Sequence, residues 1–283
     1  MFQLITPDHK KILQKLLQRI PKDDLSIIVE DLARLINQIR EDIPEKKRIS
    51  TGRYTIIKKL GQETFLLLKE TDIDLFEIAT DIFNLSDTDP FVRSFAVQLI
   101  AIYGLESGDL SKTLPFFERA ACDEEWIVRE CSSSLIRKFV KTYPMELSKW
   151  YIKMVKSPDP LHRRFMSESL RPVVENRWIP KDPDYALSII QHLYKEASPY
   201  PRTSVGNNLS DWIRVDQDRA WKIVKKLAAN GDKNSYWIAY RACRNLVKTK
   251  PVQVMRLLGV EQYKYKTRVH TLNDDKGIES KRS

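Results

Sequence analysis

The sequence predicts an all-α protein built as a solenoid of stacked helical repeats. The 283-residue chain has only 8 glycines and no clear run of alternating apolar residues, which disfavours β-sheet and glycine-rich nucleotide loops. A capping residue followed by proline also recurs along the chain. The intervals between these helix starts are those of a helix–turn–helix solenoid.

The recurring start places a capping residue directly before proline in Asp89-Pro90, Asp159-Pro160 and Ser198-Pro199. The cap side chain satisfies an orphan backbone N–H, and proline loses nothing at the first helical position because its missing donor would be unpaired anyway. Asp123 begins a fourth unit without proline. The starts at 89, 123, 159 and 198 are 34, 36 and 39 residues apart.

Amphipathic segments between these starts supply the second helix of each repeat. They lie near residues 110–122, 145–156, 185–197 and 220–229, with apolar residues at three- and four-residue steps. A single helix pair cannot bury its apolar stripe without neighbours, so we expect a stacked array with a curved inner surface.

Three regions are expected along the chain. Residues 1–80 look helical, beginning at a Thr6-Pro7 cap, but their repeats are degenerate, so they predict a capping region. Residues 81–260 form the repeat array. Residues 261–283 have few large apolar side chains, which predicts a polar, disordered tail.

The charge balance favours a polyanionic partner. Lys and Arg number 48 against 38 Asp and Glu, a net charge of +10, and each neutralised phosphate releases a condensed counterion. The alternative is a basic surface without function. The three cysteines form no CxxC pair and suit no zinc spacing, which indicates reduced core residues of a cytoplasmic protein.

Several signals are missing from the sequence. It contains no GxxxxGK[ST], HExxH or GxSxG motif, and its four histidines are scattered, so we expect no metal and no cofactor. No basic segment precedes a long apolar one at the N-terminus, and no apolar run is long enough to span a bilayer. We therefore expect no membrane partner.

An arginine recurs near the beginning of each predicted inner helix. There its side chain and the free N–H groups of the helix can together bind phosphate. The alternative is ion pairing between repeats. The candidate phosphate-binding residues are Arg93, Arg129, Arg163, Arg164, Arg202, Arg241 and Arg244.

Four segments follow one another between residues 85 and 260. They are Trp126–Glu130 (WIVRE), His162–Pro172 (HRRFMSESLRP), Arg202–Asp211 (RTSVGNNLSD), and Arg241–Lys248 (RACRNLVK) with Leu257–Gly259 (LLG). In this order they resemble the WxVxE, RRxxxEGLRP, RxSVxNxLxD and RALRTLxK…LLG segments of the AlkC-type branch of the HEAT-like-repeat DNA alkylation-repair glycosylases. Four ordered segments are far more specific than any one of them.

The resemblance implies a solenoid of HEAT-like repeats with a concave basic face. It also implies hydrolytic excision of cationic alkylated bases, such as 3-methyladenine or 3-methylcytosine, from double-stranded DNA without a cofactor. Positive charge builds on the deoxyribose as the bond to the base breaks, and a carboxylate near the sugar stabilises it and orients the attacking water.

By this resemblance, Glu130, Glu168 and Asp211 fall on the acidic positions of the family's catalytic site. Equivalent helices of successive repeats line one face, so the three carboxylates can border one pocket. Each acid has the alternative role of a salt bridge to a repeat arginine. These residues are therefore the candidate catalytic acids.

Trp126 and Trp178 are the candidate stacking residues for a base or sugar. Trp126 lies four residues before Glu130, on the same helical face, with core packing as its alternative role. The family often carries a tryptophan near the position of Glu175 and Asn176, and Trp178 is slightly displaced from that position.

Two other functions stay open at this point. A HEAT-repeat module that binds damaged or branched DNA without cutting it would keep the basic face and lack a complete lesion pocket. A protein-interaction scaffold is the third possibility, because most such arrays bind proteins. A basic solenoid with one working face has no need to dimerise, so we expect a monomer.

Overall fold

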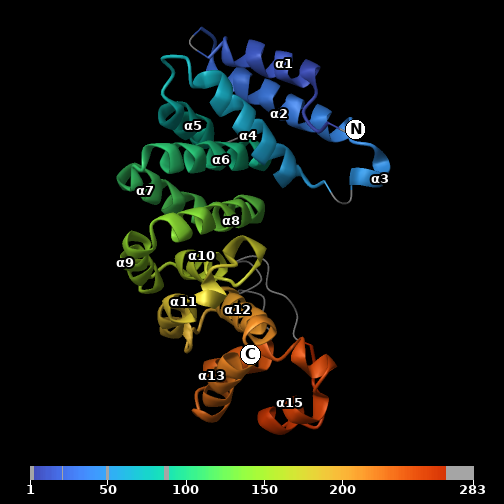
Figure 1. Cartoon of the computed structure of the whole chain (residues 1–283), viewed down its shortest axis with the longest axis vertical. Coiled ribbons are helices and arrows are strands. Elements are labelled where there is room, and N and C mark those ends of the chain that lie inside the picture. Colours follow the sequence, from blue (N-terminus) through green and yellow to red (C-terminus); the bar gives the residue numbers. More distant parts are fainter. Residues whose placement is uncertain (1–2, 21, 49–50, 86–88, 266–283) are drawn as a thin grey trace, which may run out of the picture. The chain divides into compact units, whose positions relative to one another are not determined.

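The computed structural model describes residues 3–20, 22–48, 51–85 and 89–265. Within these ranges the chain forms fifteen α-helices and four short 3-10 helices, and no strand (Figure 1). The prediction of an all-α protein made of helical repeats is therefore confirmed. None of the helices in the described part of the chain has the length and apolar character needed to cross a membrane.

The chain divides into two compact units, residues 1–135 and 136–283, and the division falls within helix α8 (Trp126–Thr142). The predicted regions, 1–80, 81–260 and 261–283, stay a prediction. Of the predicted tail, only residues 261–265 belong to the described ranges, and they pack against helix α14 (Lys233–Ala242). The expectation of disorder beyond residue 265 lies outside the described residues.

The N-terminal unit is built around helix α6, whose residues are mostly buried. Helices α2, α4, α5 and α7 all pack on α6, and α1 packs on α2 and α4. A Cβ at Gly61 would lie 2.7 Å from Cγ of Gln98, so glycine permits the close approach of α4 and α6. The bounds are α1 (Pro7–Leu17), α2 (Leu25–Glu41), α3 (Glu45–Arg48), α4 (Arg53–Leu68), α5 (Leu75–Asn84), α6 (Pro90–Ser107) and α7 (Leu110–Ala121).

The C-terminal unit has two layers of helices. Helices α10, α12 and α14 lie side by side in one layer, while α9 packs on α10, α13 packs on α12 and α14, and α11 packs on α9. Trp212, Tyr151 and Phe165 are among the largest fully buried side chains. The bounds are α9 (Pro144–Val155), α10 (Pro160–Ser169), α11 (Pro183–Ile190), α12 (Pro199–Val215), α13 (Gln217–Ala229) and α15 (Pro251–Leu258), with short 3-10 turns η1 (Val174–Asn176), η2 (Ile179–Lys181), η3 (Gln191–Leu193) and η4 (Leu246–Lys248).

The predicted helix starts at Asp89-Pro90, Asp159-Pro160 and Ser198-Pro199 are confirmed, since α6, α10 and α12 begin at residues 90, 160 and 199, whereas α8 begins at Trp126, three residues after the predicted start at Asp123. Asp89 and Asp159 cap their helices by accepting hydrogen bonds from the N–H groups of Phe91 (2.7 Å) and Leu161 (2.8 Å). Ser198 occupies the N-cap position of α12, but its side chain makes no capping hydrogen bond. The start of α12 is therefore marked by the proline at its first position and not by a side-chain cap.

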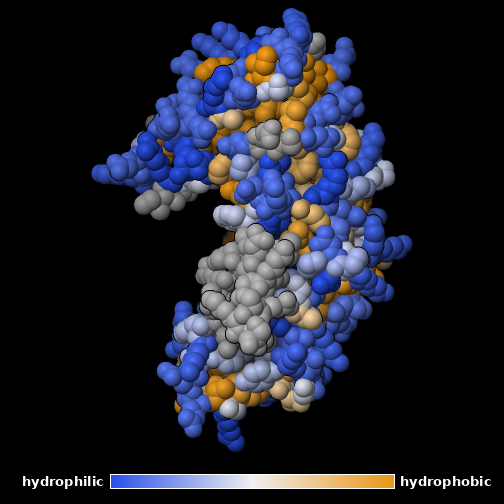
Figure 2. All heavy atoms as spheres, turned by 180° about the vertical axis from the view of Figure 1, so that it is seen from behind, coloured by the Kyte–Doolittle hydropathy of each residue, from blue (hydrophilic) through white to orange (hydrophobic). Residues whose placement is uncertain are grey.

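Hydrophilic side chains cover most of the face shown in Figure 2. The large apolar side chains lie mainly inside the two units, as expected for helices that each bury one face. The exposed large apolar residues are scattered over several helices, and Val252, Met145 and Leu66 are among the most exposed. Single exposed apolar residues of this kind indicate no binding surface by themselves.

Candidate active site

Glu168 and Asp211 meet on the guanidinium group of Arg171. Glu168 lies in the last turn of α10, Arg171 lies two residues after the end of that helix, and Asp211 lies on α12. Nη1 of Arg171 donates to Oε2 of Glu168 at 2.9 Å, and Nε donates to Oδ2 of Asp211 at 2.7 Å, with Nη2 2.6 Å from the same oxygen. We call these three residues the acid–arginine cluster. It joins two of the three predicted catalytic acids.

Glu168 is held as a carboxylate although it is buried. Burial alone raises the pKa of this carboxyl group, but the charges of Arg171 and Arg164 and the hydrogen bonds from Arg171 and Ser204 lower it to about 2. The Ser204 hydroxyl donates to Oε1 at 2.7 Å. Nη2 of Arg137 donates to the backbone carbonyl of Glu168 at 3.0 Å. Both carboxylate oxygens of Glu168 are thus bound by protein donors.

The backbone that carries Arg171 is fixed by Asn176. The Asn176 side chain is fully buried, and its amide donates to the carbonyl of Ser169 at 2.7 Å and to that of Arg171 at 3.0 Å. A buried side-chain amide that bridges two carbonyls restrains the turn between them. Asn176, near the position where the resembling family often has a tryptophan, therefore holds the Arg171 turn.

The acid–arginine cluster reaches solvent mainly through its arginines. The Glu168 and Asp211 side chains are each 6% exposed, while Arg171 is 24% and Arg214 68% exposed. Nη2 of Arg214 lies 3.6 Å from Oδ1 of Asp211. Oδ1 of Asp211 thus faces the exposed side chain of Arg214. Two carboxylates around one guanidinium give the cluster a net charge of −1.

The third predicted acid, Glu130, lies half-buried on α8 in the N-terminal unit. Convergence of Glu130 with Glu168 and Asp211 stays a prediction. Trp126, one turn earlier on α8, is 55% exposed, so the alternative of core packing is wrong for this residue. An indole exposed to this extent is open to stacking on a ligand.

Trp178 lies against another aromatic ring. Its indole centroid is 5.3 Å from the ring of Tyr185 on α11, and the Tyr185 hydroxyl donates to the carbonyl of Pro144 at 2.9 Å. These contacts attach the segment after η1 to the layer of α9 and α11. Stacking of Trp178 on a base or sugar stays a prediction. In the structure its indole contacts the ring of Tyr185.

Three of the seven predicted phosphate-binding arginines bridge consecutive repeats. Arg93 donates to both carboxylate oxygens of Asp123 (2.9 and 3.1 Å), and Arg163 does the same with Glu196 (2.6 and 3.0 Å). Nη1 of Arg202 donates to Oδ1 of Asn234 at 2.6 Å. The partners lie 30, 33 and 32 residues further along the chain. We call Arg93, Arg163 and Arg202 the arginine ladder.

Asp123 and Glu196 lie in the turns before α8 and α12, and Asn234 lies in the first turn of α14, so the contacts fit the alternative of pairing between repeats. The other four predicted arginines also contact protein groups. Arg129 donates to the carbonyls of Asp123 and Glu124, Arg241 donates to Asn207, and the Arg164 guanidinium lies over the Tyr200 ring. Arg244 lies half-buried after α14. Phosphate binding by the seven stays a prediction.

Comparison with known proteins identifies the fold. No protein-family model matches the chain, and no curated protein sequence is significantly similar to it. Three solved structures match. The Pseudomonas fluorescens alkylpurine DNA glycosylase AlkC, bound to DNA containing an abasic site analog, is 17% identical over 90% of this chain and 67% of its own, with a TM-score of 0.59. The chain shares its fold.

Two Streptococcus mutans proteins have the same AlkC-like fold. AlkD2 is 21% identical over 75% of this chain and 97% of its own, with a TM-score of 0.58. The protein smu.31, from strain UA159, is 23% identical over 68% of this chain and 98% of its own, with a TM-score of 0.53. At these identities the likeness shows the fold alone.

Within the AlkC-like fold, the sequence motifs led to Glu168 and Asp211 but not to the groups that bind them. Arg171 stands inside the matched segment, three residues after Glu168, and an opposite charge at this spacing is a recognised helix-surface pair. The three-residue spacing in the sequence was therefore enough to predict the contact between Arg171 and Glu168. Ser204, Arg214 and Asn176 had no comparable signal, because their contacts join segments distant in the sequence or depend on the turn after α10.

Proposed function

We propose that this protein is a DNA glycosylase of alkylation repair that hydrolyses the N-glycosidic bond of cationic alkylated bases in double-stranded DNA. One observation carries the proposal. Glu168 and Asp211, 43 residues apart in the sequence, are bound to the same guanidinium group. They lie in a fold shared with an alkylpurine DNA glycosylase whose structure is bound to DNA containing an abasic site analog.

The chemistry follows from the charge of the substrate. A cationic base takes the electron pair of its bond to C1′ and leaves neutral, so it needs no acid to protonate it. Positive charge then builds on the sugar, where the carboxylate of Asp211 stabilises it and accepts a proton from the attacking water. The sugar keeps the water oxygen at C1′. Arg171 and Glu168 hold Asp211 in position, and the reaction requires no cofactor.

Release of methylated base from alkylated duplex DNA tests the proposal. Wild type should release base, and Asp211→Asn should reduce the rate about 100-fold or more, the usual effect of removing one electrostatic stabiliser of a transition state. Glu130→Gln tests whether the acid on α8 takes part. Asp218→Asn is the matched control, because Asp218 is exposed on α13. Folding of each variant is checked by circular dichroism, and absence of release by folded wild type would contradict the enzyme.

A second function is favoured by the burial of the acids. Glu168 and Asp211 are each only 6% exposed, and both are bound by Arg171, while the buried Asn176 lies near the position where the resembling family often has a tryptophan. These features fit a module that binds damaged or branched DNA without cutting it. This alternative predicts tight binding of abasic or alkylated DNA by wild type with no base released.

A further inference from the structure

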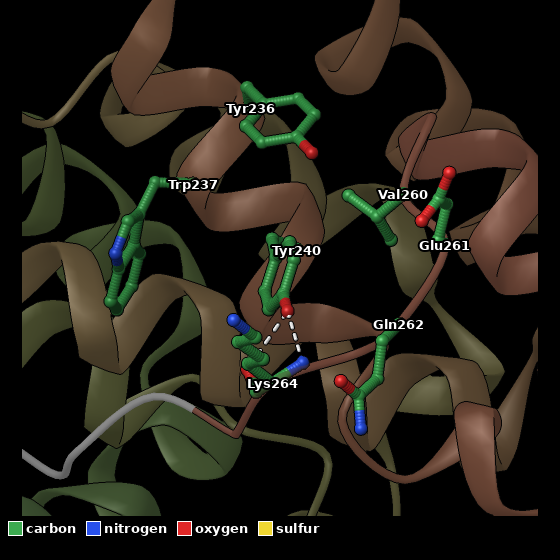
Figure 3. A pocket seen from close by; sticks show the side chains of 7 residues that line it. All are labelled: Tyr236, Trp237, Tyr240, Val260, Glu261, Gln262 and Lys264. Atoms are coloured by element: carbon green, nitrogen blue, oxygen red, sulfur yellow. Dashed lines mark hydrogen bonds between the residues drawn. The ribbon is translucent and has the colours of Figure 1, made fainter.

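A cavity of about 540 Å³ lies where α14 meets the segment that follows α15 (Figure 3). Tyr236, Trp237 and Tyr240 of α14 line it on one side, and residues 260–262 and Lys264 line it on the other. Its volume falls within the roughly 300–1,000 Å³ of most small-molecule sites. None of its lining residues belongs to the acid–arginine cluster.

The wall of the cavity is fixed by hydrogen bonds from tyrosine hydroxyls to backbone. Tyr236 donates to the carbonyl of Leu258 at 2.8 Å. The Tyr240 hydroxyl donates to the carbonyl of Lys264 at 2.9 Å and accepts from its N–H at 2.6 Å. Tyr263 donates to the Tyr240 carbonyl at 2.8 Å, and the two rings stack with centroids 4.4 Å apart. The cavity is therefore formed before any ligand binds.

Trp237 is also held in place from within the protein. The guanidinium of Arg202 lies 4.7 Å from the centroid of the Trp237 ring, and Arg202 is itself bonded to Asn234. In Figure 3 the Trp237 ring stands on one side of the open space, with Val260 and Glu261 on the opposite side. A fixed indole at the edge of a cavity offers a stacking surface at little cost in conformational entropy.

We propose that this cavity binds a nucleotide, with the nucleobase stacked on Trp237 and the phosphate at Lys264. Every nucleobase has a π-face, so an aromatic wall binds it without regard to sequence. The side-chain amide of Gln262 offers both a donor and an acceptor to the base edge. The Lys264 ammonium group supplies a positive charge for phosphate. This inference goes beyond the proposed glycosylase, because it concerns a separate site.

The charges around the cavity favour this ligand over an organic cation. Aromatic walls also attract cations, but Lys264 at the rim and Arg202 against Trp237 repel a positive ligand, and Glu261 is the one acid among the lining residues. Two sources can supply a nucleotide, namely a free mononucleotide and an unpaired base of a DNA strand. Both present the same base and phosphate.

Isothermal titration calorimetry of the full chain tests the site. Deoxyadenosine monophosphate should bind more tightly than deoxyadenosine, and inorganic phosphate more weakly than either. Trp237→Ala should weaken nucleotide binding about 5- to 150-fold, the range of base–aromatic stacking, while Trp237→Phe should keep most of it. Lys264→Ala should remove the preference for nucleotide over nucleoside. Lys250→Ala is the matched control, because Lys250 is exposed outside the cavity.

A second titration identifies the source of the nucleotide. A short single-stranded oligonucleotide that binds more tightly than the mononucleotide, and more tightly than a blunt duplex, would assign the cavity to an unpaired base in DNA. Equal affinity for mononucleotide and oligonucleotide would assign it to the free nucleotide. No binding of either by folded wild type, or unchanged affinity in folded Trp237→Ala, would overturn the site.

The nucleotide site and the proposed glycosylase fail separately. Asp211→Asn should bind deoxyadenosine monophosphate as wild type does, because Asp211 does not line the cavity. Wild type that binds the nucleotide but releases no methylated base would refute the enzyme and keep this site. Wild type that releases base but binds neither nucleotide nor oligonucleotide at the cavity would do the reverse.

Discussion

Glu168 is a buried charge that depends entirely on its donors. Transfer of an isolated carboxylate into a protein interior costs several kcal/mol, so such a group either becomes protonated or is paired. Arg171 and Ser204 bind its two oxygens, and the positive charges of Arg171 and Arg164 lie nearby. Glu168 therefore remains ionised, and in the proposed enzyme it orients Arg171 toward Asp211.

Glu168→Gln should lower the free energy of unfolding by about 3 kcal/mol at pH 7, the lower end for breaking a buried ion pair, because Arg171 retains Asp211. The carboxyl pKa falls from 4.5 to about 2 on folding. A group with a lower pKa in the folded state stabilises the protein above its unfolded pKa, and this contribution is lost as the pH falls toward the folded value. Urea unfolding at pH 7 and pH 3 measures both effects.

The difference between wild type and Glu168→Gln should therefore shrink between pH 4.5 and pH 2. Glu175→Gln is the control, because Glu175 is 55% exposed and lies 3.9 Å from Arg137, and we expect it to change the free energy of unfolding by less than about 0.5 kcal/mol. A Glu168→Gln variant as stable as wild type at pH 7 would contradict the role of the donors.

The residues of the candidate site were only partly predictable from the sequence. Motif positions were enough to nominate Glu168 and Asp211, and the structure joins them. The shared Arg171 contact with Asp211 spans 40 residues, and a contact of that range depends on how α10 and α12 pack. The role of Asn176 depends on the path of the turn after α10, which no local pattern specifies.

The arginine ladder acts between helices. Arg163 donates to Glu196 through Nε and Nη2 and to the carbonyls of Ser157 and Pro158 through Nη1, so one side chain joins the turn before α10 to the turn before α12. The Arg163 and Glu196 side chains are 17% and 6% exposed. Partial burial and two parallel hydrogen bonds make this pair stronger than an ordinary surface ion pair.

A double-mutant cycle tests the pair. Arg163→Ala and Glu196→Ala should each lower the free energy of unfolding by about 3 kcal/mol. The double variant should lose less than their sum, with a coupling of about 1 kcal/mol or more, because the two residues share one interaction. Arg177→Ala, at an exposed position, is the control. Additive losses, measured by chemical denaturation, would show that Arg163 stabilises the repeats by another route.

The sequence predicted where most of the inner helices begin, but it did not predict which residues of neighbouring repeats contact one another. Asp89 and Asp159 act on N–H groups two residues away, and such local rules hold in almost any tertiary setting. The ladder uses arginines at the same recurring positions, but its partners lie in the next repeat. The same arginine pattern was therefore compatible with phosphate contact and with pairing between repeats.

The net charge of +10 belongs to the whole molecule, and the described contacts show that part of the arginine content is already neutralised. Arg93 binds the carboxylate of Asp123, and Arg163 binds that of Glu196. Arg171 binds both acids of the acid–arginine cluster. In the proposed glycosylase, electrostatic attraction of DNA would then come from basic groups that remain exposed. Arg214, 68% exposed beside Asp211, is one such group.

This division of the arginines gives a prediction for DNA binding as a function of salt. If the protein contacts about four phosphates, its affinity for duplex DNA should fall about 100-fold between 50 and 200 mM salt. Arg214→Ala should reduce the slope of log affinity against log salt concentration by about one. Folded Arg163→Ala should leave the slope unchanged, because its guanidinium already binds Glu196. Fluorescence anisotropy with a labelled duplex measures each slope.

Two results would contradict this division of the arginines. An equal decrease of the slope in both variants would show that Arg163 contacts phosphate. A wild-type slope near zero would show that the positive charge of the protein does not serve DNA binding.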